Sequence, residues 1–180
     1  MKNIVVLYKS KYGSTKQYAQ WIAEELDVPL LEASKVTPAQ LKTYDLIIYG
    51  GGLYARTING VKLVTRNPCK ALVVFTVGLS NPATTNYSEV LSATFTPEML
   101  DKTPIFHFHG GIFYGKLTTV HKGMMSMVKK HLEKQPPISR TAEDNNLIEA
   151  YGKDVDFSDR SSIAPLIQYV RAWQNESVNS

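Results

Sequence analysis

The chain has 180 residues, 43% of them hydrophobic and 20% charged, which is typical of one compact globular domain and excludes general disorder and a collagen-like repeat. Its single cysteine, Cys69, excludes an intramolecular disulfide and a multi-cysteine metal site built from this chain alone, and it favours a reducing compartment. The net charge of +4 is uneven, because residues 61–140 carry 10 basic and 4 acidic side chains whereas residues 141–180 carry 3 and 7.

Five short apolar runs are expected to form strands, and segments with helical spacing alternate with them. The predicted strands cover residues 3–8, 28–33, 45–50, 70–78 and 103–111. The predicted helices cover residues 13–26, 38–41, 61–66 and 88–101, the last in two pieces split near Pro97. Strands that alternate with helices pair in parallel through right-handed crossovers. The sequence therefore predicts an α/β fold with a three-layer, doubly wound sheet.

The chain is expected to form a single domain over residues 1–180, with a helical insertion at about 112–158 after the fifth strand and a closing helix at 163–173. The insertion contains a Met-rich helix, which carries Met124, Met125, Val128 and Leu132 on one stripe. Such a stripe indicates either core packing or an adaptable surface for an apolar ligand.

Four of the predicted strands end in loops rich in Gly, Ser, Thr, Asn or Tyr, and these loops should meet at one edge of the sheet, where such folds bind ligands. The first loop runs from Tyr8 to Thr15 and enters a helix N-terminus, where unpaired NH groups and the helix dipole favour an anion. Its three hydroxyls, from Ser10, Ser14 and Thr15, suit a phosphate monoester better than a simple helix cap. The loop lacks both the P-loop and the dinucleotide-binding fingerprints, so a mononucleotide is favoured.

The first strand, loop and helix resemble the N-terminal signature of the flavodoxins and flavodoxin-like flavoproteins. The matching positions are Val6, Leu7, Tyr8, Ser10, Gly13, Thr15, Ala19 and Ile22. The resemblance implies a flavodoxin-like α/β/α sandwich with a five-stranded parallel sheet of order 2-1-3-4-5 and FMN as the cofactor. It also implies that a run of six residues wraps the FMN phosphate: Ser10, Lys11, Tyr12, Gly13, Ser14 and Thr15.

Two further loops resemble the loops that contact the flavin ring in this family. From the loop after Gly50, the resemblance implies contacts by Leu53, Tyr54 and Ala55, with Tyr54 against one ring face; the alternative is a surface Tyr after a flexible turn. From the loop after the fourth strand, it implies contacts by Val77, Gly78, Leu79 and Asn81; the alternative is an ordinary turn. No Tyr follows in that loop until Tyr87, which leaves the second stacking partner undetermined.

His107 and His109 alternate with phenylalanines on the fifth strand, so both imidazoles should face one side. Hydrogen-bonded histidines are favoured over a metal site, because no carboxylate or thiolate lies nearby in sequence. His109 is the one candidate catalytic residue, as a proton donor beside the flavin.

The segment after the fifth strand also resembles the menaquinone-dependent protoporphyrinogen oxidases, which are flavodoxin-like enzymes with an insertion in this region. Two functions stay open: flavin electron transfer to a redox partner protein, and oxidation of a porphyrinogen-type molecule with a quinone acceptor. The basic helix at 116–134 is typical of contact with an anionic membrane surface, and nucleic acid is disfavoured. The N-terminal apolar run is too short for a signal peptide, so we expect a cytoplasmic protein, either free in solution or peripheral to the membrane.

Overall fold

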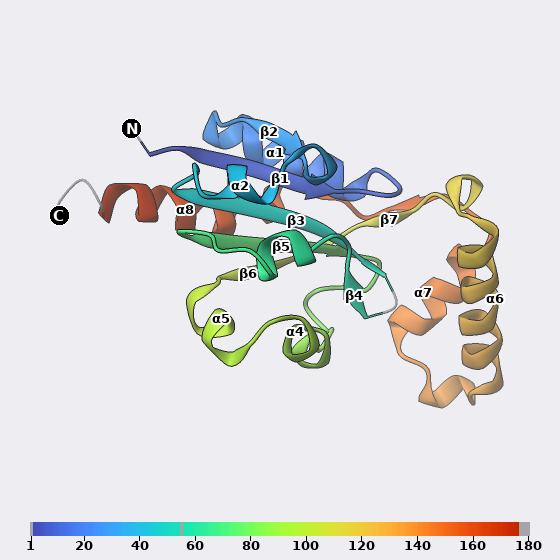
Figure 1. The fold of residues 1–180 in the computed structure, drawn as a ribbon. Helices are drawn as coiled ribbons and strands as arrows, with labels where there is room; N and C mark the ends of the chain where they lie inside the picture. The colour runs from blue at the N-terminus through green and yellow to red at the C-terminus, as the bar shows by residue number, and fades with distance from the viewer. Residues whose placement is uncertain (1, 55, 177–180) are drawn as a thin grey trace.

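The computed structural model describes residues 2–54 and 56–176 and has a central parallel sheet with helices on both faces (Figure 1). The strands of the sheet run in the order β2-β1-β3-β5-β6, and β4 pairs antiparallel with the end of β3. Their bounds are β1 Ile4–Lys9, β2 Leu30–Glu32, β3 Leu46–Tyr54, β4 Thr57–Ile58, β5 Leu72–Gly78 and β6 Ile105–His109. Since β5 and β6 are the fourth and fifth parallel strands along the chain, the predicted fold and the order 2-1-3-4-5 are confirmed.

Helices form the two outer layers. The α-helices are α1 Ser14–Leu26, α2 Pro38–Leu41, α3 Lys62–Thr65, α4 Ser88–Thr94, α5 Pro97–Lys102, α6 Thr119–Lys134, α7 Ala142–Ala150 and α8 Ala164–Glu176. Short 3₁₀ turns are η1 Ala33–Lys35, η2 Tyr114–Lys116, η3 Pro137–Ser139 and η4 Arg160–Ile163. The helices at 88–102 are split at the position predicted, with Pro97 at the first turn of α5, where its missing NH costs nothing.

Each face of the sheet has its own core. On one face, Ile4 and Val6 of β1 pack with α1 and α8, where Tyr18 and Leu166 are fully buried. On the other, Val5 and Leu7 pack against the layer formed by η1 and α2–α5. Because β1 is buried on both sides, its sequence is an unbroken apolar run rather than an alternating one.

The triple glycine lies in a strand, which corrects the predicted loop after Gly50. β3 continues to Tyr54, pairing Gly50 with Phe75 and Gly51 with Thr76 of β5. A Cβ added at Gly50 would lie 2.1 Å from Cζ of Phe75, so the glycine makes room for that buried ring. Glycine is therefore needed here for its lack of a side chain and not to form a turn. The strand continues past the edge of the core and carries Leu53 and Tyr54 with it.

A helical hairpin follows β6. The two-residue strands β7 (Gly111–Ile112) and β8 (Val155–Asp156) pair antiparallel and enclose residues 113–154, which hold α6 and α7. In Figure 1 this hairpin stands at the end of the sheet toward which the parallel strands point. Neither α7 nor β8 was predicted, because the polar stretch 141–146 has no clear apolar period. The assignment of the whole chain to one domain stays a prediction.

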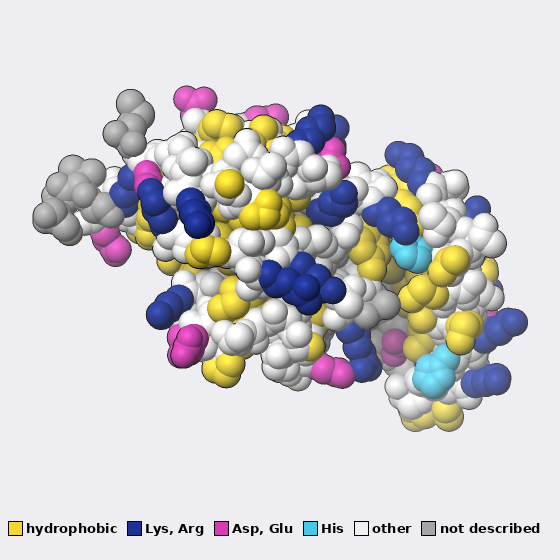
Figure 2. Space-filling view, in the orientation of Figure 1, with side chains coloured by type: hydrophobic (Ala, Val, Ile, Leu, Met, Phe, Trp, Pro, Cys, Tyr) yellow, Lys and Arg dark blue, Asp and Glu magenta, His cyan; other side chains and the backbone are white. Residues whose placement is uncertain are grey.

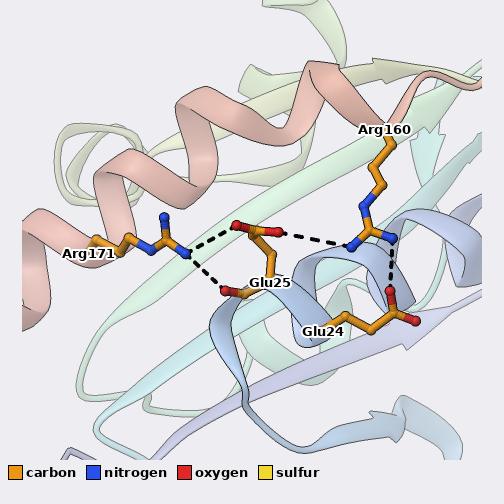
Figure 3. A network of polar contacts seen from close by, with 4 residues as sticks. All are labelled: Glu24, Glu25, Arg160 and Arg171. Atoms are coloured by element: carbon orange, nitrogen blue, oxygen red, sulfur yellow. Dashed lines mark hydrogen bonds and ion pairs between the residues drawn. The ribbon is translucent and has the colours of Figure 1, made fainter.

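Ion pairs connect α1 with the C-terminal part of the chain (Figure 3). Arg160 of η4 lies 3.0 Å from a carboxylate oxygen of Glu24, and Arg171 of α8 lies 3.1 Å from one of Glu25. All four side chains are about half exposed, so these pairs orient α8 more than they stabilise it.

Within the described residues, no helix combines the length and apolarity needed to cross a bilayer.

Candidate functional site

A cavity of about 210 Å³ lies at the carboxyl ends of the parallel strands. All four loops expected to meet there contribute to its wall, as does α6 from the far side. The lining residues are Tyr12, Ser14, Thr15, Leu53, Tyr54, Val77, Gly78, Leu79, Gly110, Gly111, Ile112, Phe113, Leu117, His121, Met124 and Met125. The predicted convergence of the loops is therefore confirmed, and we call this space the edge cavity.

The first loop ends in a helix N-terminus without a side-chain cap. Gly13 precedes α1 with φ +110°, a backbone conformation that residues with a side chain rarely adopt, and no side chain among the described residues caps the first NH groups of the helix. Ser14 and Thr15 line the edge cavity, and Ser14 Oγ accepts a hydrogen bond from the NH of Gly111. These first-turn NH groups and hydroxyls give this part of the cavity wall its hydrogen-bond donors.

Ser10, Lys11 and Gly13 lie beside the edge cavity rather than in its wall. Ser10 Oγ accepts a hydrogen bond from the NH of Gly13 at 3.1 Å, so this hydroxyl closes the loop on itself. The Lys11 side chain is exposed, with its ammonium 5.6 Å from the centre of the Tyr12 ring.

Three rings cluster in the wall of the edge cavity. Tyr54 and His121 are stacked, with centroids 5.6 Å apart, and the Tyr12 ring lies edge-on to both. The Tyr12 hydroxyl is hydrogen-bonded to Nδ1 of His121, and burial, together with the nearby Tyr12, raises the pKa of Tyr54 to about 12. Burial and the Lys11 charge lower the pKa of His121. The hydrogen bond from Tyr12 to His121 ties α6 to the first loop. Ala55 lies outside the described residues.

From the third loop, Val77, Gly78 and Leu79 line the edge cavity, whereas Asn81 does not; their contacts with the flavin stay a prediction. Asn81 lines a second cavity of about 580 Å³, which shares Leu79 and Ile112 with the first and lies toward α7. Its side-chain oxygen accepts a hydrogen bond from the NH of Ala83.

His109 also faces the second cavity. Its ring is stacked on Phe157 at 4.4 Å between centroids, and its Nε2 donates to the carbonyl of Leu79 at 2.8 Å. The structure therefore separates His109 from the edge cavity by the third loop, and its proposed role as proton donor stays a prediction.

His107 is hydrogen-bonded, as favoured from the sequence. Its Nδ1 lies 2.6 Å from Thr76 Oγ1, and the ring of Tyr87 stacks on it at 3.6 Å between centroids. Tyr87 thus packs on the sheet edge and is absent from the wall of the edge cavity. Among the residues that the structure describes, no three His, Cys, Asp or Glu side chains gather in a way that could hold a metal ion.

His107 should make the protein less stable in acid. Burial lowers the pKa of His107 from 6.5 to about 4, so between these pH values the unfolded chain takes up a proton that the folded chain does not. This contribution is complete above pH 6.5 and is lost as the pH falls toward 4, with a size of about 1–2 kcal/mol after allowing for partial exposure. Urea unfolding from pH 7 to pH 4 measures it. In His107→Gln the free energy of unfolding should fall between pH 7 and pH 4 by about 1–2 kcal/mol less than in the wild type. If the free energy of unfolding falls equally in the two proteins, His107 does not cause the loss of stability.

The helical hairpin supplies a further wall, of which the sequence analysis did not identify Phe113, Leu117 and His121 and left open whether Met124 and Met125 pack in the core or face an apolar ligand. The available signal was the adjacent pair Met124–Met125 on an amphipathic helix. The predicted stripe is in fact divided, because Met125 and Leu132 turn inward whereas Val128 is exposed.

Comparisons with known proteins found one matching family and several similar solved structures. A family model described as a flavodoxin domain matches residues 5–139, which is about three quarters of the chain. Similar solved structures include a flavodoxin from the domain Archaea, at 18% identity and TM-score 0.43 over 59% of this chain and 82% of that one. Another is a flavoprotein in complex with FMN from Lactobacillus acidophilus, at 16% identity and TM-score 0.40 over 61% of this chain and 93% of that one.

A curated relative, an uncharacterised protein of Methanocaldococcus jannaschii, is 39% identical over 51 residues, or 28% of this chain. The chain spans about a third of that relative's length, 34%. The family assignment therefore rests on the domain match, which extends from β1 through the four loops and α6 to η3. On that match, the chain belongs to the flavodoxin-domain family.

Proposed function

We propose that this protein binds FMN non-covalently in the edge cavity and uses it for electron transfer. The observation that carries the proposal is a single cavity whose wall combines a donor-rich helix N-terminus at Ser14 and Thr15 with apolar and aromatic side chains at Leu53 and Tyr54. A phosphate monoester joined to a planar ring needs both kinds of wall, and the family match supports the same ligand.

The residues present fit this cofactor. The first-turn NH groups of α1 and the hydroxyls of Ser14 and Thr15 would hold the phosphate, and the exposed Lys11 adds positive charge beside the loop. Tyr54 would cover one ring face, and the backbone at Val77–Leu79 would bond the polar edge of the ring. FMN supplies the electron chemistry, while these residues bind and orient it.

Helix α6 would cover the opposite side of the ring. Met124, Met125 and Leu117 give the edge cavity an apolar outer wall, and Tyr87 is engaged with His107 instead. The Tyr12–His121 hydrogen bond holds this wall against the first loop. The bound ring would therefore be shielded from water, so its partner would approach an edge rather than an open face.

Comparing FMN with riboflavin tests the proposal, because riboflavin carries the ring without the phosphate. Isothermal titration of the purified protein should show FMN binding at least about a hundredfold more tightly than riboflavin, since the phosphate takes up several charge-assisted hydrogen bonds. If FMN and riboflavin bind with equal affinity, the α1 N-terminus has no role in binding the phosphate. If the folded protein binds neither ligand, the proposal is wrong.

Removing the helical hairpin should loosen the cofactor without unfolding the sheet. Ile112 and Val155 are paired, so residues 113–154 can be replaced by an Asn-Gly turn that joins β7 directly to β8. Neither core cluster includes residues from this segment. FMN affinity should fall about tenfold, with burial of the ring lost over one face, and iodide should quench the flavin fluorescence more strongly.

Two single methionine substitutions provide a control for the replacement of the whole hairpin. Met125→Ser alters the wall of the edge cavity and should weaken FMN binding, whereas Met127→Ser alters a side chain that is 73% exposed and should not. Unchanged FMN affinity and quenching in the hairpin replacement would contradict a covering role for α6.

The proposed partner is a redox protein that exchanges electrons with the FMN. The alternative, oxidation of a porphyrinogen-type molecule with a quinone acceptor, has one observation against it: neither the edge cavity nor the second cavity is lined by a Lys or Arg that would pair with substrate carboxylates. Anaerobic addition of protoporphyrinogen to the FMN-loaded protein distinguishes the two. The electron carrier should keep its flavin absorbance near ~450 nm, and the oxidase should lose it.

A further inference from the structure

Helix α6 carries an exposed apolar stripe on its outer side. Val120 and Met127 are 71% and 73% exposed, and Val128 lies next to them on the same face of the helix. Ile138, just beyond the helix in η3, is 96% exposed. These four side chains, here called the α6 ridge, are most of the large hydrophobic side chains that stand exposed among the described residues. Figure 2 shows apolar and basic side chains side by side on this part of the molecule.

The other side of α6 explains how the helix is held. Leu132 is buried and Met125 lines the edge cavity. Lys122 lies 5.6 Å from the ring centre of Tyr114, and Lys129 lies 4.6 Å from that of Tyr151. The inner face is thus occupied by packing, and the α6 ridge faces away from it.

Positive charge borders the α6 ridge. Residues 116–134 contain five lysines and one acidic residue, Glu133, which pairs with Lys129 on the helix. Lys130 and Lys134 are exposed on the flank of the α6 ridge, and neither forms an ion pair with any residue that the structure describes. Since no lysine lines either cavity near α6, this charge serves the outer surface and not a ligand held inside.

We propose that the α6 ridge docks on the surface of an anionic lipid bilayer. An apolar ridge flanked by lysines matches a flat surface with anionic headgroups, into which the unbranched Met127 can insert while the lysines stay at headgroup level. The 16 residues of α6 give a contact about 24 Å long. No side chain of the α6 ridge lines any of the three described cavities.

Vesicle co-sedimentation of the full chain tests the proposal. The protein should bind vesicles made of one part phosphatidylglycerol to one part phosphatidylcholine, and it should bind pure phosphatidylcholine at least about tenfold more weakly. Most of the bound protein should be released by about 0.5 M salt, because each lysine near an anionic surface contributes about one kilocalorie per mole that salt screens. The assay is run with and without FMN, and the same result is expected in both, because the ridge lies outside the edge cavity. Failure of FMN binding would therefore leave this result standing.

Two variants test whether vesicle binding depends on the α6 ridge or only on the net charge of the protein. Lys130→Glu/Lys134→Glu and Met127→Glu should each lower vesicle binding at least about tenfold. The control Lys42→Glu/Lys102→Glu makes the same charge change at two exposed lysines on the body of the protein, Lys42 just after α2 and Lys102 at the end of α5, and should keep most of the binding. Equal losses in the two double variants would overturn the ridge as the docking site.

A third variant distinguishes insertion from adsorption. Met127→Trp places an indole on the ridge, and its emission should shift to the blue and be quenched by brominated lipids only with anionic vesicles. If the folded wild-type protein does not bind anionic vesicles at low salt, or if this Trp reports no insertion, the proposal is wrong and the ridge is left to an acidic protein partner.

Discussion

Replacing Ser14 with aspartate should weaken FMN binding by about a hundredfold or more and leave riboflavin binding within about threefold of the wild type. Ser14 stands at the first turn of α1, where a carboxylate is tolerated by the helix dipole but would face the dianionic phosphate across a few ångströms. A hundredfold loss corresponds to about 2.7 kcal/mol. Titrations of both ligands, with thermal unfolding of the unliganded variant, measure the effect.

Gln20→Asp is the matched control for Ser14→Asp. It adds the same charge to the same helix, more than one turn further along and away from the edge cavity, so FMN affinity should change by less than about threefold after screening. If Ser14→Asp binds FMN as the wild type does, the phosphate does not lie at this helix N-terminus.

Replacing Gly50 with alanine should lower the free energy of unfolding by about 3 kcal/mol, at the upper end of the cost of overpacking a core. The new Cβ would meet Cζ of Phe75 at 2.1 Å, and Phe75 is fully buried between β3 and β6 and cannot turn away cheaply. Urea unfolding measures the loss.

Two further variants test whether the loss of stability in Gly50→Ala comes from the clash with Phe75. Gly123→Ala, at an exposed helix position where nothing lies within 4 Å of the added Cβ, should instead raise the free energy of unfolding by up to about 1 kcal/mol. Adding Phe75→Leu to Gly50→Ala should cost less than the sum of the two single changes, because the smaller side chain relieves the clash. Strict additivity would contradict the packing explanation.

The sheet was predictable because its strands have a simple physical signature. Runs such as Ile4–Leu7 are buried on both faces and read as uninterrupted apolar sequence, and the alternation with helices then requires parallel pairing. The course of the chain after Gly50 was not predictable in the same way. Glycine signals a turn and a close approach equally well, and only the position of Phe75 across the sheet shows that close approach is the reason.

The wall of the candidate site at the N-terminus of α1 was predictable for a local reason, because strand, loop and helix are consecutive in sequence. The wall from α6 was not, since α6 reaches the edge cavity only after the chain has passed through β6 and β7. His121 meets Tyr12 across 109 positions of sequence, a separation over which no spacing rule operates. Asn81 and His109 were expected at the flavin, but the third loop turns both toward the second cavity.

The most direct test of the central claim is a visible spectrum of the purified protein, recorded before and after one equivalent of FMN and then during anaerobic reduction and reoxidation. The account predicts flavin peaks near ~375 and ~450 nm that stay with the protein through gel filtration, bleach on reduction and return fully on reoxidation. A folded protein that elutes without flavin after incubation with excess FMN would contradict it.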